Sequence, residues 1–282
     1  MKKHPVQLSL LDPLEPAQAA TRSWRSAADR ARRSKWNAVY DHFQENPAEM
    51  DMLMSMAERL RDETRMEVDP QSDLLTEEIA HALCVRMRFH HALDADALTK
   101  DKFENAIASA FKDCGYSAIK APRGNPGHDL TIGDVRYSLK TQADSKIRDA
   151  KVDIHKFMEL GKGDWSDAPE HFRALSVQVE EHLGRYERIL VFRRLKRKTH
   201  EVYELVEIPK SLVLAALKLD PVISVESASA IKPATTELVD DDGTVLRLYF
   251  DGGGERKLKI KDIRKAACHV HATWSFARRA PI

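Results

Sequence analysis

Residues 125–142 read NPGHDLTIGDVRYSLKTQ, and this stretch organises the chain around it. Hydrophobic residues alternate on both sides of Gly133-Asp134, which predicts two short strands joined by a two-residue turn. The turn pairs Ile132 with Val135, so strand alternation sends one set of polar side chains to a common face: Asp129, Thr131, Arg136, Ser138 and Lys140. The opposite face of the hairpin is predicted to belong to the core.

The polar face brings a carboxylate, a hydroxyl and an ammonium to one end of the hairpin. An ordinary solvated sheet face would carry similar residues. Asp129, however, directly follows the segment 125–128, in which Gly127 permits a bulky ligand to approach the backbone closely. Lys140 then lies two residues beyond Ser138 on the same face. We therefore favour a functional site over a solvated surface.

The segment PGHD (126–129), followed after eight residues by SLK (138–140), resembles the PD-(D/E)xK motif of metal-dependent nucleases. That superfamily includes many Type II restriction endonucleases and several repair nucleases. The resemblance implies an α+β fold with a restriction-endonuclease-like core, in which a mixed β-sheet is flanked by helices. It also implies Mg²⁺ as cofactor, Asp129 as a metal ligand and Lys140 as the catalytic lysine. The motif departs from the family pattern in two places, because His128 precedes the first acid and Ser138 replaces the second.

The carboxylate that replaces the acid missing at Ser138 is left open. Glu104 lies on a helix predicted before the hairpin, at the edge of a buried stripe where a charge needs a partner. In the nuclease family such a helix brings a carboxylate to the metal, although structural pairing with a cation explains Glu104 equally well. Glu159, on a helix expected over residues 151–160, is the other candidate. Either would complete an all-oxygen Mg²⁺ shell with Asp129 and the backbone carbonyl of Leu139.

A glycine run followed by basic residues predicts a DNA-recognition surface. Residues 252–254 are consecutive glycines, and they feed a basic strand that would form one half of a two-stranded ribbon. Such a ribbon can enter the major groove, where arginine reads guanine and glutamate accepts a hydrogen bond from cytosine. An exposed hairpin without function is the alternative. The candidate DNA contacts are Glu255, Arg256, Lys257, Lys259, Gln142 at the end of the central hairpin, and Lys162 in a glycine-flanked turn.

The remaining patterns predict the other elements of the fold. Residues 189–192 and 202–208 are rich in branched side chains, which is typical of central strands. Further strands are expected over 235–239, 245–251, 258–260 and 268–276, and helices over 21–44, 47–64, 76–93, 99–114, 168–183 and 209–217.

We expect this chain to divide into three parts. Residues 1–18 contain several prolines and are predicted to be a mobile arm. Residues 19–97 form a helical N-terminal subdomain, in which residues 65–75 are expected to be a linker. Its first helix is rich in cations over residues 22–35, which suits a phosphate-facing surface as well as a solvated one. Residues 98–282 form the catalytic and DNA-recognition core.

Composition narrows the class of protein without identifying it. The chain has 282 residues and a net charge of +1, so a nucleic-acid surface must be local rather than global. Charged residues make up 32% of the sequence, and no apolar run has the length of a membrane span, which predicts a soluble protein. No secretory signal is evident, and the odd number of cysteines favours the reducing cytoplasm: Cys84, Cys114 and Cys268.

The stretches FMELGKGDW (157–165), LVEIPK (205–210) and LYFDGGGERKLKIK (248–261) are similar to segments of one Type II restriction endonuclease. This resemblance implies Mg²⁺-dependent double-strand cleavage of DNA at a short palindromic, GC-rich site of the CCCGGG type. A palindromic target in turn implies a homodimer, and restriction implies a DNA methyltransferase that protects the host site. Two alternatives stay open: a structure- or repair-directed nuclease of the same superfamily, and a non-catalytic DNA-binding regulator that uses the basic helix.

Overall fold

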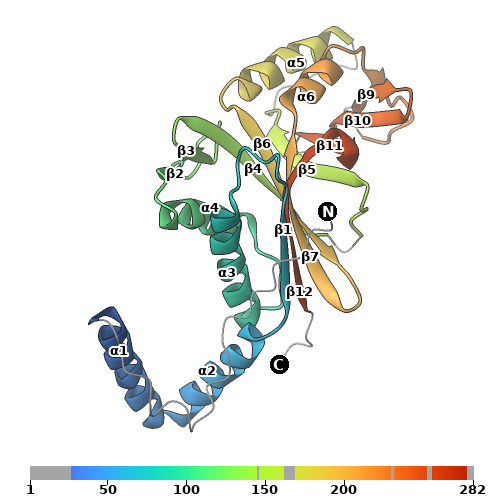
Figure 1. Cartoon of the computed structure of the whole chain (residues 1–282). Coiled ribbons are helices and arrows are strands. Elements are labelled where there is room, and N and C mark those ends of the chain that lie inside the picture. The colour runs from blue at the N-terminus through green and yellow to red at the C-terminus, as the bar shows by residue number, and fades with distance from the viewer. Residues whose placement is uncertain (1–26, 145, 162–168, 230–231, 253–255, 278–282) are drawn as a thin grey trace.

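The computed structural model describes residues 27–277, with short gaps at 145, 162–168, 230–231 and 253–255. Within these residues, a helical N-terminal part leads into two β-sheets flanked by helices (Figure 1). The predicted α+β class is therefore confirmed. The arm expected over residues 1–18 lies outside the described part. None of the described helices is both long and apolar enough to cross a membrane.

The larger sheet has seven strands and contains the central hairpin. In spatial order its strands are β1 (Thr64–Val68), β12 (His269–Ala277), β7 (His200–Ile208), β6 (Arg188–Lys196), β4 (Val135–Gln142), β3 (Leu130–Ile132) and β2 (Ala118–Lys120). Strands β4 and β6 run parallel, whereas the other neighbouring pairs are antiparallel. The sheet is thus mixed, as the sequence predicts.

The central hairpin β3–β4 has the predicted register. Ile132 pairs with Val135, and Leu130 pairs with Tyr137. Gly133 occupies the first position of the turn with a φ of 57°, a left-handed conformation that glycine adopts without a steric penalty. Its apolar face lies in the core, as expected. The opposite, polar face is partly covered as well, since Ser138 is fully buried.

A smaller sheet of five strands packs against the larger one. Its order is β5 (Lys151–Glu159), β11 (Lys257–Arg264), β10 (Gly243–Phe250), β9 (Ala234–Asp240) and β8 (Val222–Ile223). Two expectations are wrong here. The helix expected over residues 151–160 is strand β5, and the basic ribbon is not a free hairpin, because β11 lies between β10 and β5. Each strand of the ribbon therefore has its backbone paired on both sides.

Helices cover both faces of the larger sheet. They are α1 (Ala27–Gln44), α2 (Pro47–Leu60), α3 (Glu77–Leu93), α4 (Lys100–Asp113), α5 (Pro169–Leu183) and α6 (Lys210–Leu217). Helices α3 and α4 pack on one face, whereas α5, α6 and the smaller sheet pack on the other. Thr76 and Thr99 cap α3 and α4 with their hydroxyls. Helices α1 and α2 extend away from the sheets (Figure 1).

The segment expected to be a linker contains an edge strand of the larger sheet. Strand β1 pairs antiparallel with β12, and Met66 lies opposite the buried Trp274. The expectation of a polar linker over residues 65–75 is therefore wrong for its first part. Its alternating pattern, with Thr64 and Met66 buried between exposed neighbours, is that of a short half-buried strand.

Candidate active site

Asp129 is held at the edge of β4 by two backbone contacts. Its N–H donates to the carbonyl of Tyr137 at 2.8 Å, and its Oδ2 accepts from the N–H of Leu139 at 2.7 Å. A regular ladder would place Asp129 opposite Ser138, so the chain slips by one residue here. Because the N–H and C=O of one strand residue point to the same side, the carbonyl of Leu139 also faces Asp129. The predicted carboxylate and carbonyl are thus brought together.

Helix α4 brings Glu104 to the same place, where one ammonium lies between the two acids. Lys100 Nζ is 2.7 Å from Asp129 Oδ1 and 3.3 Å from Glu104 Oε1. Lys120 Nζ also lies 3.6 Å from Glu104 Oε2. The cation of Lys100 marks a position at which both carboxylates can share one positive charge. This oxygen-rich set is one that a hard divalent cation prefers.

Lys140 adds a second, more deeply buried ammonium to this cluster. Burial lowers the pKa of Lys140 to about 8, against the opposing attraction of Asp129 and Glu104. Its Nζ also lies 5.8 Å from the centre of the Phe157 ring on β5. Asp129 and Lys140 therefore act on each other electrostatically, as their shared position on the hairpin predicts. Lysines with so low a pKa are uncommon on protein surfaces and more frequent in active sites.

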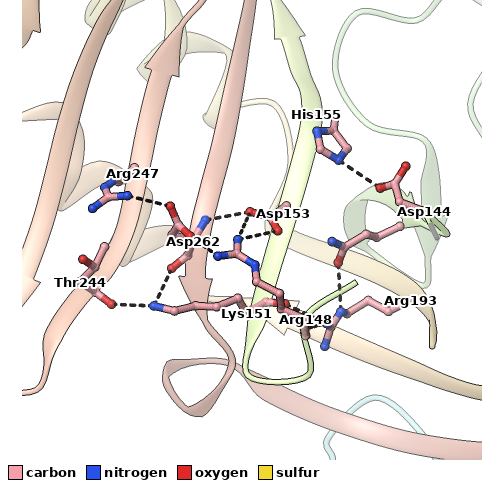
Figure 2. A network of polar contacts seen from close by, with 10 residues as sticks. Asp144, Arg148, Lys151, Asp153, His155, Arg193, Thr244, Arg247 and Asp262 are labelled. Atoms are coloured by element: carbon pink, nitrogen blue, oxygen red, sulfur yellow. Dashed lines mark hydrogen bonds and ion pairs between the residues drawn. The ribbon is translucent and has the colours of Figure 1, made fainter. Parts of the chain in front are cut away.

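A network of charges fixes the start of strand β5 beside the larger sheet (Figure 2). Arg193 on β6 is fully buried and donates to the carbonyls of Arg148 and Lys151, each at 2.8 Å. Arg148 in turn forms ion pairs with Asp153 on β5 and Asp262 on β11. These contacts join both sheets through a few rigid guanidinium groups. They hold the strand that carries Phe157 against Lys140.

Ser138 lies beside two polar side chains that the sequence does not single out. Its Oγ is buried and lacks a full hydrogen bond within the described residues, as do the hydroxyl of Tyr186 and Nε2 of His182. Burial raises the pKa of Tyr186, while Ser138 opposes that shift. Burial and then the charge of Lys140 lower the pKa of His182 to about 4, so its ring is neutral. His182 and Tyr186 are four residues apart at the end of α5, a spacing with no functional signature.

Gly127 serves the packing of this loop rather than an open approach to a ligand. A Cβ at residue 127 would lie 3.0 Å from Cβ of Arg185, in the turn that follows α5. That separation is tighter than most carbon contacts, so a side chain at residue 127 would require one of the two segments to shift by a few tenths of an ångström. The neighbouring Pro126 also interacts through its backbone with His182. The loop before Asp129 is thus fitted against the end of α5.

Two other predicted site residues lie apart from this cluster. Glu159 is exposed at the end of β5 and forms an ion pair with Lys156. Gln142 is only 3% exposed, and its Oε1 accepts from Nε of Arg193 at 3.0 Å. The buried, structural position of Gln142 contradicts its expected contact with DNA. It belongs instead to the charge network that supports β5.

The predicted DNA-recognition residues are placed unevenly. Arg256 is only 8% exposed, so it does not present a free guanidinium at the tip of a ribbon. Lys259 forms an ion pair with Asp251 and lies 5.3 Å from the ring of Tyr249. Lys257 is partly exposed at the start of β11. Glu255 and Lys162 lie outside the described residues.

The larger sheet, with its helices and the hairpin acids beside a buried lysine, is consistent with the restriction-endonuclease-like core of nucleases that hydrolyse phosphodiesters. The family model of SmaI, described as a Type II site-specific deoxyribonuclease, matches residues 44–276, so the chain belongs to this family. The chain is also 39% identical over 199 residues to the Type II restriction enzyme SmaI of Serratia marcescens, covering 70% of this chain and 78% of that enzyme. No solved structure matches it. The restriction-enzyme class inferred from the sequence is confirmed.

Proposed function

We propose that this protein uses Mg²⁺ to cut both strands of DNA at a short, GC-rich palindrome of the CCCGGG type. Family membership supports site-specific cleavage of DNA, and the target type follows from the sequence resemblance. The observation that carries the active-site assignment is the ammonium of Lys100 between Asp129 and Glu104. It supports this assignment, because the two carboxylates already pair with one positive charge.

Asp129, Glu104 and the carbonyl of Leu139 are the groups that would hold the ion. When bound, Mg²⁺ supplies Lewis-acid polarisation of the scissile phosphate and lowers the pKa of a coordinated water. The N–H of Leu139 fixes the orientation of the Asp129 carboxylate. We place Glu104 ahead of Glu159 in this role, because Glu104 shares a cation with Asp129 whereas Glu159 is exposed at the end of β5.

Lys140 is assigned to the attacking water and to the charge that develops on the phosphate. Its ammonium lies in a poorly solvated position, where electrostatic stabilisation is stronger than in bulk water. Ser138 carries no charge and is turned toward Tyr186, so its part is to keep the strand packed rather than to bind the ion. Lys100 is partly exposed. Once Mg²⁺ occupies the position between Asp129 and Glu104, the Lys100 ammonium can turn toward a DNA phosphate.

We assign the assembly to a homodimer, as two symmetric cuts in a palindrome require. Helices α1 and α2 expose large apolar side chains away from the sheets: Trp36, Val39, Tyr40, Met52 and Met54. A second copy of this chain is the occupant we propose for that surface. Sedimentation of the wild type and of Trp36→Glu tests it, since the substitution should shift the protein toward the monomer. A monomeric wild type at the concentrations that support cleavage would remove this assignment.

The remaining assignments concern the cellular setting and the division of the chain. We propose residues 19–97 as the dimer-forming part, residues 98–282 as the catalytic and DNA-recognition part, and a cytoplasmic location. Protection of the host then requires a DNA methyltransferase with the same site preference. Host DNA should accordingly resist cleavage by the purified protein, whereas the same DNA amplified in vitro should be cut.

One experiment tests the proposed function most directly. Purified protein is incubated with phage DNA and Mg²⁺, and the ends of the products are sequenced. We expect discrete fragments whose ends share one GC-rich palindrome. Cleavage without a shared sequence would indicate a structure- or repair-directed nuclease, and binding without cleavage would indicate a regulator. Either outcome would overturn the restriction assignment.

A further inference from the structure

A second group of metal-binding side chains lies where β12 and β7 meet the loop after β1. One ring nitrogen of His269, one of His271 and a carboxylate oxygen of Asp73 all lie within 4.8 Å of one another. The two histidines come from the start of β12, and Asp73 follows β1 in the sequence. Segments nearly two hundred residues apart thus place three potential ligands around one point.

Both histidines approach a carboxylate through the same nitrogen. His271 Nε2 lies 2.9 Å from Glu207 Oε2, and His269 Nε2 lies 3.1 Å from Asp69 Oδ2. A neutral imidazole that donates Nε2–H to a carboxylate keeps its lone pair on Nδ1. Metal-binding histidines are commonly oriented in this way, with a carboxylate behind the ring.

Two existing contacts would have to change: the pairing of both Asp73 carboxylate oxygens with Arg188, and the contact of His271 with Ser72. The hydroxyl of Ser72 lies 2.9 Å from His271 Nδ1, so it donates to that nitrogen in the metal-free protein. The same Oγ accepts from the N–H groups of Leu74 and Leu75, which fixes the oxygen but leaves its proton able to turn elsewhere. A cation bound at Nδ1 would lie close to this oxygen, so the Ser72 hydroxyl would have to move aside and give up contacts with the backbone of the loop.

The charge of the cluster suits a divalent cation. Asp69, Asp73 and Glu207 contribute three negative charges, and Arg188 contributes one positive charge through ion pairs with Asp73 and Glu207. With both imidazoles neutral, these four groups carry a net charge of −2. One divalent cation would neutralise this charge.

The backbone at His271 is also irregular. The pairing of β12 with β7 shifts register between Val270 and Ala272, which places His271 at a β-bulge. Bulges change the direction of a side chain and recur beside functional sites. His271 is fully buried, whereas the side chains of His269 and Asp73 are partly or largely exposed. An ion would thus reach a buried ligand from an open side.

We propose that His269, His271 and Asp73 form a binding site for a transition-metal dication such as Zn²⁺, separate from the Mg²⁺ site at Asp129. Two imidazole nitrogens and one carboxylate oxygen match the ligand preference of Zn²⁺, whereas Mg²⁺ prefers oxygen ligands alone. The ion ties the loop after β1 to β12. Its role is therefore to secure the edge strand on which the N-terminal helices depend.

The test measures Zn²⁺ binding to the chelator-treated full chain by isothermal titration calorimetry, together with thermal unfolding. We expect one Zn²⁺ per chain, a higher unfolding temperature with Zn²⁺, and no competition by Mg²⁺. His269→Ala and Asp73→Asn should each weaken binding by at least about tenfold, and Glu207→Gln by about 10- to 100-fold through loss of ring orientation. Because His271 is buried, it is left unchanged so that folding is preserved.

The matched control is His155→Ala. His155 lies on strand β5, outside the histidine cluster. Its Nε2 also lies near a carboxylate, 3.0 Å from Asp144 Oδ2. This variant should bind Zn²⁺ like the wild type. Absence of Zn²⁺ binding by the wild type, or equal binding by His269→Ala and the wild type, would overturn the proposal. Phage DNA cleavage in Mg²⁺ alone tests the proposed nuclease independently, because it does not require the histidine cluster.

Discussion

Two polar clusters on the larger sheet each hold acids around a cation, but the cations differ. Lys100 offers a single ammonium to Asp129 and Glu104, and its side chain is partly exposed on the first turn of α4. Arg188 binds Asp73 and Glu207 through several N–H groups of a rigid fork. An ammonium on a flexible side chain is readily replaced by another cation, whereas a guanidinium that is hydrogen-bonded to carboxylates on both sides is not. The cluster of Asp129 and Glu104 is therefore suited to exchanging its cation during a reaction, and the cluster of Asp73 and Glu207 to stabilising the fold.

The largest expected effect comes from the first cluster. Asp129→Ala and Lys140→Ala should each lower the cleavage rate by at least about 100-fold, as removal of a single charge-stabilising group does in other enzymes. DNA binding without metal separates the two. Asp129→Ala removes a negative charge beside the phosphate, so binding should stay equal or tighten, whereas Lys140→Ala should leave it equal or weaker. Gel-shift titration in EDTA beside a Mg²⁺ time course measures both effects.

A contrary result is easily recognised. Near-normal cleavage by either variant would move the active site away from the hairpin. The cluster of Asp129 and Glu104 would then have no catalytic role that distinguishes it from the cluster around Arg188.

The next prediction separates the two candidates for the second carboxylate. Glu104→Gln keeps the side-chain volume but removes the charge, so the Mg²⁺ concentration for half-maximal cleavage should rise by about tenfold or more. Glu159→Gln serves as the matched control and should leave it unchanged, because Glu159 is exposed and paired with Lys156. Magnesium titrations of the cleavage rate decide the matter. A larger effect in Glu159→Gln would reverse the assignment.

Stability at different pH values sharpens the contrast between the buried cations. The pKa of Lys140 falls from 10.5 to about 8, so the unfolded chain binds more protons between these values and stability rises with pH across that window. Lys140→Met removes the buried charge and should stabilise the fold at neutral pH, by at most on the order of 3 kcal/mol. The difference from wild type should shrink between pH 8 and 10.5. Urea unfolding at several pH values measures it.

Arg188 supplies the opposite case for the same measurement. Burial lowers its pKa, but its pairing with Glu207 and Asp73 raises the pKa further, so the net shift is upward. The stability difference between Arg188→Met and wild type should therefore stay constant across the pH window that affects Lys140. A pH-independent difference for Lys140→Met would show that its ammonium is well solvated.

The smallest expected effect concerns Lys100. If its ammonium competes with the metal, Lys100→Met should lower the Mg²⁺ concentration for half-maximal cleavage by a few-fold, since an exposed ion pair contributes at most about 1 kcal/mol. Lys102→Met is the matched control, because Lys102 lies on the same turn of α4 and pairs with Asp94 instead. A higher Mg²⁺ requirement in Lys100→Met would assign this lysine to substrate binding rather than competition.

The hairpin and strand β5 show what the sequence can and cannot predict. Around the Gly133 turn, strict alternation of apolar residues sets the register without outside help. In β5 the apolar residues Ile154, Phe157 and Met158 follow at spacings of three and four, which imitates a helix. The cause is an irregularity in its pairing with β11, between Leu258 and Ile260, which disturbs the alternation. Local periodicity therefore fails where a bulge interrupts it.

The candidate site divides in the same way. Asp129, Lys140 and Glu104 were predicted because motif spacing and a charged residue on an apolar stripe are visible in sequence. Lys100 was not, because its pairing with Asp129 depends on how α4 packs against the hairpin, although it lies one turn before Glu104. His182 was not, because it reaches the site from α5. The sequence does not indicate the histidine cluster, because Asp73 follows a different strand and lies far from His269 and His271 in the chain. Gln142 was misassigned because its burial depends on β5 and Arg193.

The fit of Gly127 against Arg185 makes the position of Asp129 sensitive to helix α5. With no side chain between them, the loop and the end of the helix have little slack, and His182 adds a second contact at Pro126. We therefore expect the loop and the end of α5 to move together rather than to pivot about each other. A displacement of α5 would shift Asp129, the proposed metal ligand, along with the loop that carries it.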